Sequence, residues 1–382
     1  MLAVAIGWQV YAIHRDPLDL GLIGLAEFLP LPLLALPAGH LADRMSRRVV
    51  TAASLVIDVA IAVALVAITL AGAHALGPFL AVGALAGVAS VVGSPATRAL
   101  TPELVPVDLL PGALALRSVA SQIGIVAGPA LGGVIFAIEP VAVYSLAAAL
   151  FMAAFASILA LPRRAAPLVD EPSPSRDSLV AGVRFVLGTR TLLGAIALDL
   201  FAVLLGDSIA LAPVFARTIL GVGPVGLGAL RTAPAIGALA AGLMLTRRPL
   251  RTRAGPTLLV VVAIFGAGMI VFGLSKWLPL SLAALAVTGF VDMISMNIRA
   301  TTVALVTPIE LQGRVNAVEW VFISASNELG AFESGLVASL IGTVAAVVAG
   351  GAAMMGIAAG WTRLFPELAR MGPLEELRPA ST

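Results

Sequence analysis

Apolar residues in this chain come in long stretches, and short arginine-rich loops separate them. A hydrocarbon core roughly 30 Å thick needs about 20 apolar residues of helix to cross it. Helices also satisfy their own backbone hydrogen bonds where no water is present. We therefore predict an all-α polytopic membrane protein whose spans, in chain order, are residues 1–13, 20–41, 49–71, 76–96, 111–138, 141–161, 194–216, 223–245, 257–274, 278–300, 315–340 and 343–362.

The composition supports a bilayer as the solvent, because 60% of the residues are hydrophobic, 12% are charged and the mean hydropathy is +1.05. A single water-soluble core could not bury that much apolar surface. The first stretch has no basic segment and no cleavage site, so it does not resemble a signal peptide. At about 1.5 Å per residue it covers only about two thirds of the core, and we expect Met1 to lie inside a truncated first helix.

The residue inventory argues against an enzyme. The chain has no cysteine and three scattered histidines, so it has no thiolate metal site and no histidine pair at metal-binding spacing. Its single lysine, Lys276, is followed by tryptophan, which excludes a phosphate-binding loop for a nucleotide. We expect no cofactor and no metal. The sequence pI of 9.6 comes from loop arginines rather than a basic face, so we expect no nucleic-acid partner.

The basic residues also set an orientation. If the loop that holds Arg47 and Arg48 is cytoplasmic, that side carries eighteen of the 23 Lys and Arg residues. The opposite side keeps Arg15, Arg217 and Lys276. This bias matches the positive-inside rule. We predict a multi-pass protein of the bacterial inner membrane with both termini in the cytoplasm.

A segment rich in proline, serine and charge, Pro162 to Ser178, divides the spans into two groups of six. The two halves contain similar segments. Arg98 with Thr101-Pro102-Glu103-Leu104 in the first half corresponds to Arg299 with Thr307-Pro308-Ile309-Glu310-Leu311 in the second. Such parallel repeats are typical of one transporter architecture, with a substrate site near the midplane. We expect a six-helix bundle over 1–161, a cytoplasmic linker over 162–190, a second bundle over 191–363 and a cytoplasmic tail over 364–382.

The loop after the second span reads Gly39-His40-Leu41-Ala42-Asp43-Arg44-Met45-Ser46-Arg47-Arg48. It resembles the cytoplasmic loop signature of the Major Facilitator Superfamily, with Ser46 in place of the usual glycine. The resemblance implies that fold, with two six-helix halves. Gly39 permits close helix approach, and Asp43 can accept from arginines such as Arg44, Arg47 and Arg48 and so latch one conformation. The alternative is a plain solvated loop.

The fifth span contains a glycine motif that resembles the one found in exporters of the superfamily. Its positions are Gly124, Gly128, Pro129, Gly132 and Gly133. Small residues let membrane helices pack closely, and proline removes a backbone donor and permits a bend. Simple helix packing is the alternative, and in either case the role is conformational.

Three further segments resemble the branch that includes the bacterial enterobactin exporter. They are Pro95 to Arg98, Asn327 to Gly335 and Leu364 to Leu368. The resemblance implies export of a siderophore or an amphipathic drug.

Charged residues inside spans are functional hypotheses, because burying a charge at the midplane costs at least about 2.5 kcal/mol. Glu27 is the leading candidate for a titrating carboxylate, with a glutamate that is hydrogen-bonded within the bundle as the alternative, and the prolines after it predict an irregular helix. Asp207 and Arg231 lie at equal depth on consecutive helices, so we predict an ion pair, with separate snorkelling or cavity-facing positions as the alternative.

The remaining polar candidates are Asp58, Asp292, Asn297, Glu328 and Glu333. Asp292 and Asn297 are candidates for cavity lining. Glu328 and Glu333 lie about 140° apart around one helix, so both cannot face one small site. Arg117 and Glu319 are shallow, and we interpret them as structural.

Together these patterns predict a secondary active transporter that works by alternating access. We expect it to export a small amphipathic molecule, siderophore or drug-like, by proton-coupled antiport. Its partners would be that substrate, protons and membrane lipids, and we expect a monomer. A uniporter or importer would have the same sequence features. A non-transporting sensor or scaffold is a distant alternative, which would require a signalling domain that the sequence does not show.

Overall fold

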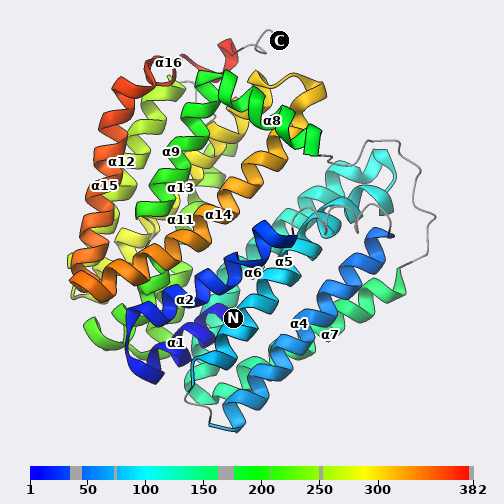
Figure 1. Ribbon diagram of the computed structural model, residues 1–382, viewed down its shortest axis with the longest axis vertical. Helices are drawn as coiled ribbons and strands as arrows, with labels where there is room; N and C mark the ends of the chain where they lie inside the picture. Colours follow the sequence, from blue (N-terminus) through cyan, green and yellow to red (C-terminus); the bar gives the residue numbers. More distant parts are fainter. Residues whose placement is uncertain (35–44, 73–74, 162–175, 207, 249–252, 378–382) are drawn as a thin grey trace. The chain divides into compact units, whose positions relative to one another are not determined.

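The computed structural model describes residues 1–34, 45–72, 75–161, 176–206, 208–248 and 253–377 (Figure 1). Within these residues all regular elements are helices, which confirms the predicted all-α fold. The chain forms two compact units. The first unit comprises Met1–Ser173 with Val222–Ala229, and the second comprises Pro174–Gly221 with Leu230–Thr382.

The first unit is built from long antiparallel helices in which α4 packs against both α5 and α7 (Figure 1). Helix α1 contacts α2, α6 and α7. In chain order the elements are α1 (Leu2–His14), α2 (Pro17–Phe28), α4 (Arg47–Leu70), α5 (Gly77–Leu104), the 3-10 turn η1 (Val107–Leu109), α6 (Leu110–Ile138) and α7 (Pro140–Ala160).

A polar junction at Gln9 joins three of these helices. The Tyr144 hydroxyl of α7 donates to Gln9 Oε1 over 2.7 Å, and Gln9 Nε2 donates to Thr69 Oγ1 of α4 over 3.2 Å. Tyr144 is fully buried. Buried polar groups without partners are costly, so this closed network fixes α1, α4 and α7 in one register.

Helix α2 is interrupted where the sequence predicts irregularity. Its regular part ends at Phe28, Leu29 forms a turn, and the chain is helical again from Pro30 to Leu34. A side chain at Gly87 of α5 would overlap the Glu27 carbonyl oxygen and lie 3.0 Å from Pro30 Cγ. Glycine therefore lets α5 approach α2 at the interruption.

The second unit holds the remaining helices, and one of them falls in the segment predicted as linker. That helix is α8 (Arg176–Gly188). The others are α9 (Arg190–Gly206), η2 (Ile209–Leu211), α10 (Ala212–Val214), the π-helical turn η3 (Phe215–Ile219), most of α11 (Gly223–Arg247), α12 (Ala254–Leu274), α13 (Leu278–Val306), α14 (Ile309–Ile341), α15 (Thr343–Leu364), α16 (Pro366–Ala369) and η4 (Leu374–Glu376).

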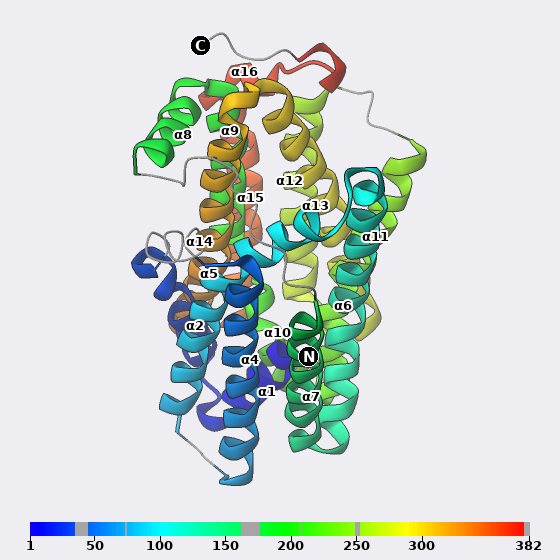
Figure 2. The same ribbon diagram turned by 90° about the vertical axis from the view of Figure 1, so that its right-hand side faces the viewer.

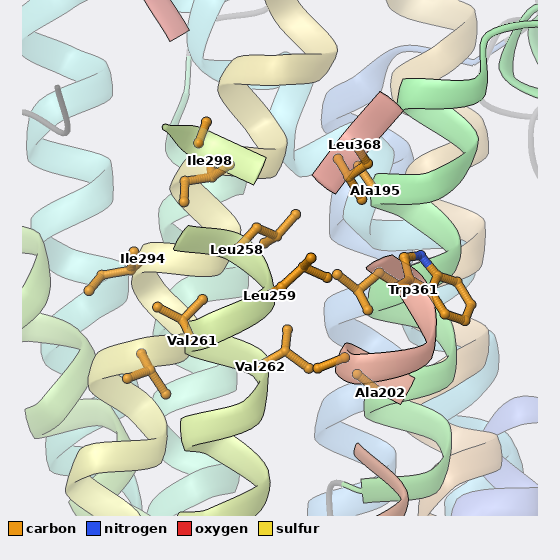
Figure 3. Packing of buried hydrophobic residues seen from close by; sticks show 14 of the residues in the cluster. Ala195, Ala202, Leu258, Leu259, Val261, Val262, Ile294, Ile298, Trp361 and Leu368 are labelled. Atoms are coloured by element: carbon orange, nitrogen blue, oxygen red, sulfur yellow. The ribbon is translucent and has the colours of Figure 1, made fainter. Parts of the chain in front are cut away.

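The core of the second unit is centred on α12 (Figure 3). Side chains from α9, α13 and α15 surround it, with Trp361 of α15 among them. The Trp361 indole N–H donates to the Gly194 carbonyl of α9 over 2.9 Å, and its ring stacks on Phe365 at 5.2 Å. Tryptophan thus contributes apolar area and also satisfies its polar atom.

Helices α12 and α15 approach each other through two glycines. A Cβ atom at Gly266 would lie 2.5 Å from the Gly351 carbonyl oxygen, and the reverse distance is also 2.5 Å. Real Cβ atoms do not approach backbone that closely. Small residues at such contacts supply the van der Waals packing that joins helices in lipid, where the hydrophobic effect does not.

The C-terminal segment up to Leu377 packs against the second unit. Figure 2 shows α16 beside the helix ends that it contacts, those of α9, α12 and α15. The Ala254 N–H donates to the Gly372 carbonyl over 3.0 Å, and the Gly255 N–H donates to the Met371 carbonyl over 3.3 Å. These bonds satisfy donors in the first turn of α12 that have no partner within the helix.

The predicted spans correspond to helices, and ten described helical segments are long and apolar enough to cross a membrane. Helix α1 is apolar but shorter. Helix α14 covers 33 residues and is not among the ten. It carries Glu310, Arg314, Glu319, Glu328 and Glu333. The most charged long helix of the second unit is therefore also a predicted span.

We predict that Gly351→Ala destabilises the second unit, because the new methyl group would collide with the α12 backbone. Overpacking typically costs about 1–3 kcal/mol. The matched control is Gly356→Ala on the same helix, where nothing lies within 4 Å of an added Cβ. Thermal unfolding of the purified protein in detergent should show a lower midpoint for Gly351→Ala alone. Equal midpoints for the two variants would contradict this packing.

Candidate functional site

The loop motif is described only in part. Gly39, Asp43 and Arg44 lie outside the described residues, while Arg47 and Arg48 begin α4. Ser46, which departs from the family pattern, is the N-cap of this helix, and its hydroxyl oxygen accepts the Val49 N–H over 3.4 Å. Serine is among the preferred N-cap residues, so the departure has a local structural reason.

The two motif arginines bind neighbouring helices of the first unit. Arg47 pairs with Glu103 of α5 at 2.9 Å. Arg48 donates from Nε to the Ile158 carbonyl over 3.0 Å and also donates to the Leu159 carbonyl. These carbonyls belong to the end of α7, where a cation is favoured by the helix dipole. The arginines thus tie the start of α4 to α5 and α7.

The glycine motif of α6 provides several close approaches. Cβ atoms at Gly128 and Gly132 would lie 3.4 Å from the Met1 nitrogen and 2.9 Å from Met1 Cα. A Cβ at Gly133 would lie 3.0 Å from Gly228 Cα, in the part of α11 that belongs to the first unit. Gly124 has nothing within 4 Å. Pro129 lies inside α6, which is one continuous helix.

The carboxylate candidates of the first unit lie on two helices. Glu27 is partly buried at the end of α2, beside Gly83 of α5, where an added Cβ would lie 3.6 Å from Glu27 Cγ. Asp58 lies midway along α4 and is also partly buried. Glu27 therefore lies two residues before Leu29, where α2 ends and its last N–H still donates to the Leu25 carbonyl.

The candidates of the second unit are spread over three helices. Asp207 lies outside the described residues, so its pairing with Arg231 of α11 stays a prediction. On α13, Asp292 is exposed and Asn297 is partly buried. Glu328 and Glu333 are partly buried on α14.

A buried ion pair that the sequence analysis did not predict joins α9 to α13. Arg299 Nη1 contacts Asp199 Oδ2, and the side chains are 8% and 11% exposed. Glu319 of α14 lies close enough for both charges to act on it. Burying two charges is costly, and removing one partner leaves the other uncompensated. The pair is the most deeply buried of the ion pairs among the described residues.

The pair was missed because the predicted spans were too short. The predicted spans 194–216 and 278–300 place Asp199 five residues after a span start and Arg299 one residue before a span end, where charges are ordinary. In the structure α9 already begins at Arg190 and α13 continues to Val306. At about 1.5 Å per residue the two charges lie roughly 10–14 Å inside their helices. A search for opposite charges at equal depth, extended beyond the apolar windows, would have found them.

A second ion pair, which is exposed, involves the first residue of α9. Arg190 Nη1 donates to Glu367 Oε1 of α16 over 2.9 Å. The Glu367 backbone N–H and the Arg190 guanidinium hydrogen-bond the carboxylate and lower the pKa of Glu367 below its usual value. A lowered pKa means that this contact is present above the ordinary glutamate range and is lost as pH falls through the folded-state pKa.

Metal ligation has no support in the described part of the chain. No group of three or more His, Cys, Asp or Glu side chains there is arranged to hold an ion.

Comparison with known proteins identifies similar sequences. The family model described as transmembrane secretion effector matches residues 1–375. The enterobactin exporter EntS of Shigella boydii is 29% identical over 287 residues, which are 73% of this chain and 67% of that exporter. EntS of Shigella dysenteriae is 30% identical over 268 residues, 68% of this chain and 62% of the exporter. The match to the second exporter thus spans less than two thirds of its length.

Solved structures show the same fold at low identity. A mutant of the nucleoside transporter NupG superposes with a TM-score of 0.72 at 13% identity, over 95% of this chain and 94% of that one. A bacterial homologue of the human lysosomal transporter Spinster, inward-facing and unoccupied, gives a TM-score of 0.71 at 15% identity, over 97% and 96% of the chains.

We predict that Asp199 and Arg299 stabilise the second unit only as a pair. Asp199→Asn and Arg299→Gln should each lose about 3–5 kcal/mol, and the double variant should recover part of the loss. The control is Arg190→Gln, which breaks an exposed pair on the same helix and should leave stability unchanged. Chemical unfolding in detergent measures the stability of the wild type and these four variants. Strictly additive losses in the double variant would show that the residues act independently.

Proposed function

This chain belongs to the transmembrane secretion effector family of the Major Facilitator Superfamily, and from that membership we propose that it exports a small amphipathic molecule. Family and fold are those of transporters, not enzymes. The observation that carries the proposal is the family match over residues 1–375 together with relatives that are named as exporters.

The export direction is supported by the relatives and by the glycine motif of α6. Both enterobactin exporters share about 30% of the aligned residues with this chain. We propose a siderophore or a drug-like amphipathic compound as cargo. The close approaches at Gly128, Gly132 and Gly133 support a conformational role for the motif.

Proton-coupled antiport is the proposed energy source. The single lysine, Lys276, excludes a nucleotide-binding loop, so an ion gradient is the default driving force. Glu27, partly buried beside an interrupted helix, is the proposed proton carrier of the first unit. A uniporter or an importer would share these features, and the uncoupler arm of the transport assay below distinguishes them.

Alternating access requires a device that favours one conformation over another. We propose that the loop motif is such a device, because Arg47 and Arg48 tie the start of α4 to α5 and α7. Asp43 and Arg44 of the same motif, with Gly39, would complete it. We expect the protein to act as a monomer surrounded by lipid.

The chain is a multi-pass protein of the bacterial inner membrane, as its ten apolar helical segments and exporter relatives indicate. The arginine bias supports cytoplasmic termini.

We predict that cells expressing the protein accumulate less cargo than cells without it. Radiolabelled enterobactin and a fluorescent amphipathic dye are loaded, and their retention is followed with and without a proton uncoupler. An uncoupler-sensitive decrease in retention is the expected result. Retention that is equal in both strains for every compound would contradict export, and a decrease that the uncoupler leaves intact would contradict proton coupling.

The orientation is testable because the chain has no native cysteine. Lys276 and Glu310 are both exposed. Lys276 lies just before the start of α13 and Glu310 lies in the first turn of α14, on opposite predicted sides of the membrane. Ser275 is a poorer labelling site, since it is buried and hydrogen-bonded to Ser281. An impermeant thiol reagent added to intact cells should modify Lys276→Cys and should reach Glu310→Cys only after permeabilisation. The opposite labelling pattern would invert the topology.

A further inference from the structure

Three charged residues converge inside the second unit, each from a different helix. Asp199 comes from α9, Arg299 from α13 and Glu319 from α14. Asp199 and Arg299 form the buried ion pair, and both exert electrostatic forces on Glu319. We call these residues the charge cluster. Glu319 is partly buried, and its helix neighbours Val315 and Val318 are fully buried.

The charge count of this cluster depends on one proton. Asp199 and Arg299 together are neutral. An ionised Glu319 leaves the cluster with one net negative charge, and a protonated Glu319 leaves it neutral. Net charge is costly in a region that excludes water. A proton is therefore the simplest ligand that balances the cluster.

Arg299 also has a hydrogen-bond donor without an acceptor. Its Nε atom is buried and has no hydrogen-bond partner among the described residues, although the Arg299 side chain is only 8% exposed. Leaving a buried donor unsatisfied is unfavourable, and more so for a charged group. The Glu319 carboxylate, on which both charges of the pair act, is the acceptor that we assign to this donor, and the structure shows Arg299 paired to Asp199.

Apart from Asp199 and Arg299, the charged residues that the structure describes on the helices packed against α14 are exposed. The helices that pack against α14 also include α8 and α15, and their described charged residues Arg184 and Arg363 are exposed. On α14 itself, Arg314 lies about one and a half turns before Glu319 and Glu328 about two and a half turns after it. Asp292 of α13 lies about two turns from Arg299 and is exposed.

We propose that the charge cluster is a proton-binding site in which Glu319 carries the proton and the Asp199–Arg299 pair tunes its release. With the proton on Glu319, the three residues of the charge cluster carry no net charge. When the proton leaves to water, the Glu319 carboxylate accepts from Arg299 Nε, which draws α14 toward α13. Its use as a coupling site rests on the proposed function; the proton binding itself does not.

The direct test is infrared spectroscopy on the purified full chain in lipid nanodiscs, without any substrate. The carboxylic-acid C=O band is titrated in the wild type, Glu319→Gln and the control Glu310→Gln, which removes an exposed glutamate from the same helix. Glu319→Gln should lose one component of the titration that Glu310→Gln retains. A titration that is the same in Glu319→Gln and the wild type would overturn the proposal.

The effect of the Asp199–Arg299 pair on proton release from Glu319 can be measured separately. In Asp199→Asn, Arg299 has only Glu319 as a partner, so the Glu319 component should move to lower pH by about one unit or more. Glu319→Asp should keep a titrating component, which separates proton binding from a folding defect of the Gln variant. An unshifted Glu319 component in folded Asp199→Asn would show that the pair does not act on the proton.

A transport measurement separates this inference from the proposed function. Proteoliposomes containing enterobactin and a pH-sensitive dye should show proton movement with enterobactin efflux for wild type. Glu319→Gln should still exchange enterobactin but should lose the accompanying proton signal. Wild type that moves neither enterobactin nor the amphipathic dye but keeps the infrared component contradicts the export proposal alone. Coupled transport that survives in Glu319→Gln contradicts the coupling site alone.

Discussion

The absence of water in the hydrocarbon core is the constraint on which the rest of this structure depends. Each backbone and side-chain polar group must find a partner inside the protein. The backbone meets this requirement through helices, and the side chains meet it through local networks. Gln9 with Tyr144 and Thr69 is one such network, and Asp199 with Arg299 is another. Both fix several helices at once, because a partner lost in lipid cannot be replaced by solvent.

The same constraint explains how these helices are held together. Apolar side chains gain little by leaving lipid for a protein interior, so close packing has to supply the attraction. Glycines are accordingly found at the tightest approaches, such as Gly87 against α2 and Gly266 against Gly351. Gly342 has a φ of 90°, which permits α14 and α15 to be joined by a single residue. The primary role of these small residues is to permit close helix packing.

Charges are arranged differently at the helix ends and inside the helices. Arg47, Arg48 and Arg190 pair with carboxylates or helix-end carbonyls where water is near, and such contacts can break and reform cheaply. Arg299 is paired where water is scarce, so any change in its partners carries a large free-energy difference. A transporter requires contacts of the first kind to change conformation and contacts of the second kind to couple that change to an ion. Helix α9 of the second unit has one contact of each kind, the exposed pair at Arg190 and the buried pair at Asp199.

The sequence by itself determined the helical class and the approximate positions of the spans, because apolar length is a local property that decides whether a helix can cross a bilayer. Its motifs indicated the family. The interruption of α2 was equally local, since Pro30 follows the last regular turn. Tertiary structure alone decided which helices meet and which charges pair. Asp199 and Arg299 are a hundred residues apart, and their apolar windows ended before the helices did. Only packing places them together with Glu319, because contact between helices depends on rotation and depth, which hydropathy does not encode.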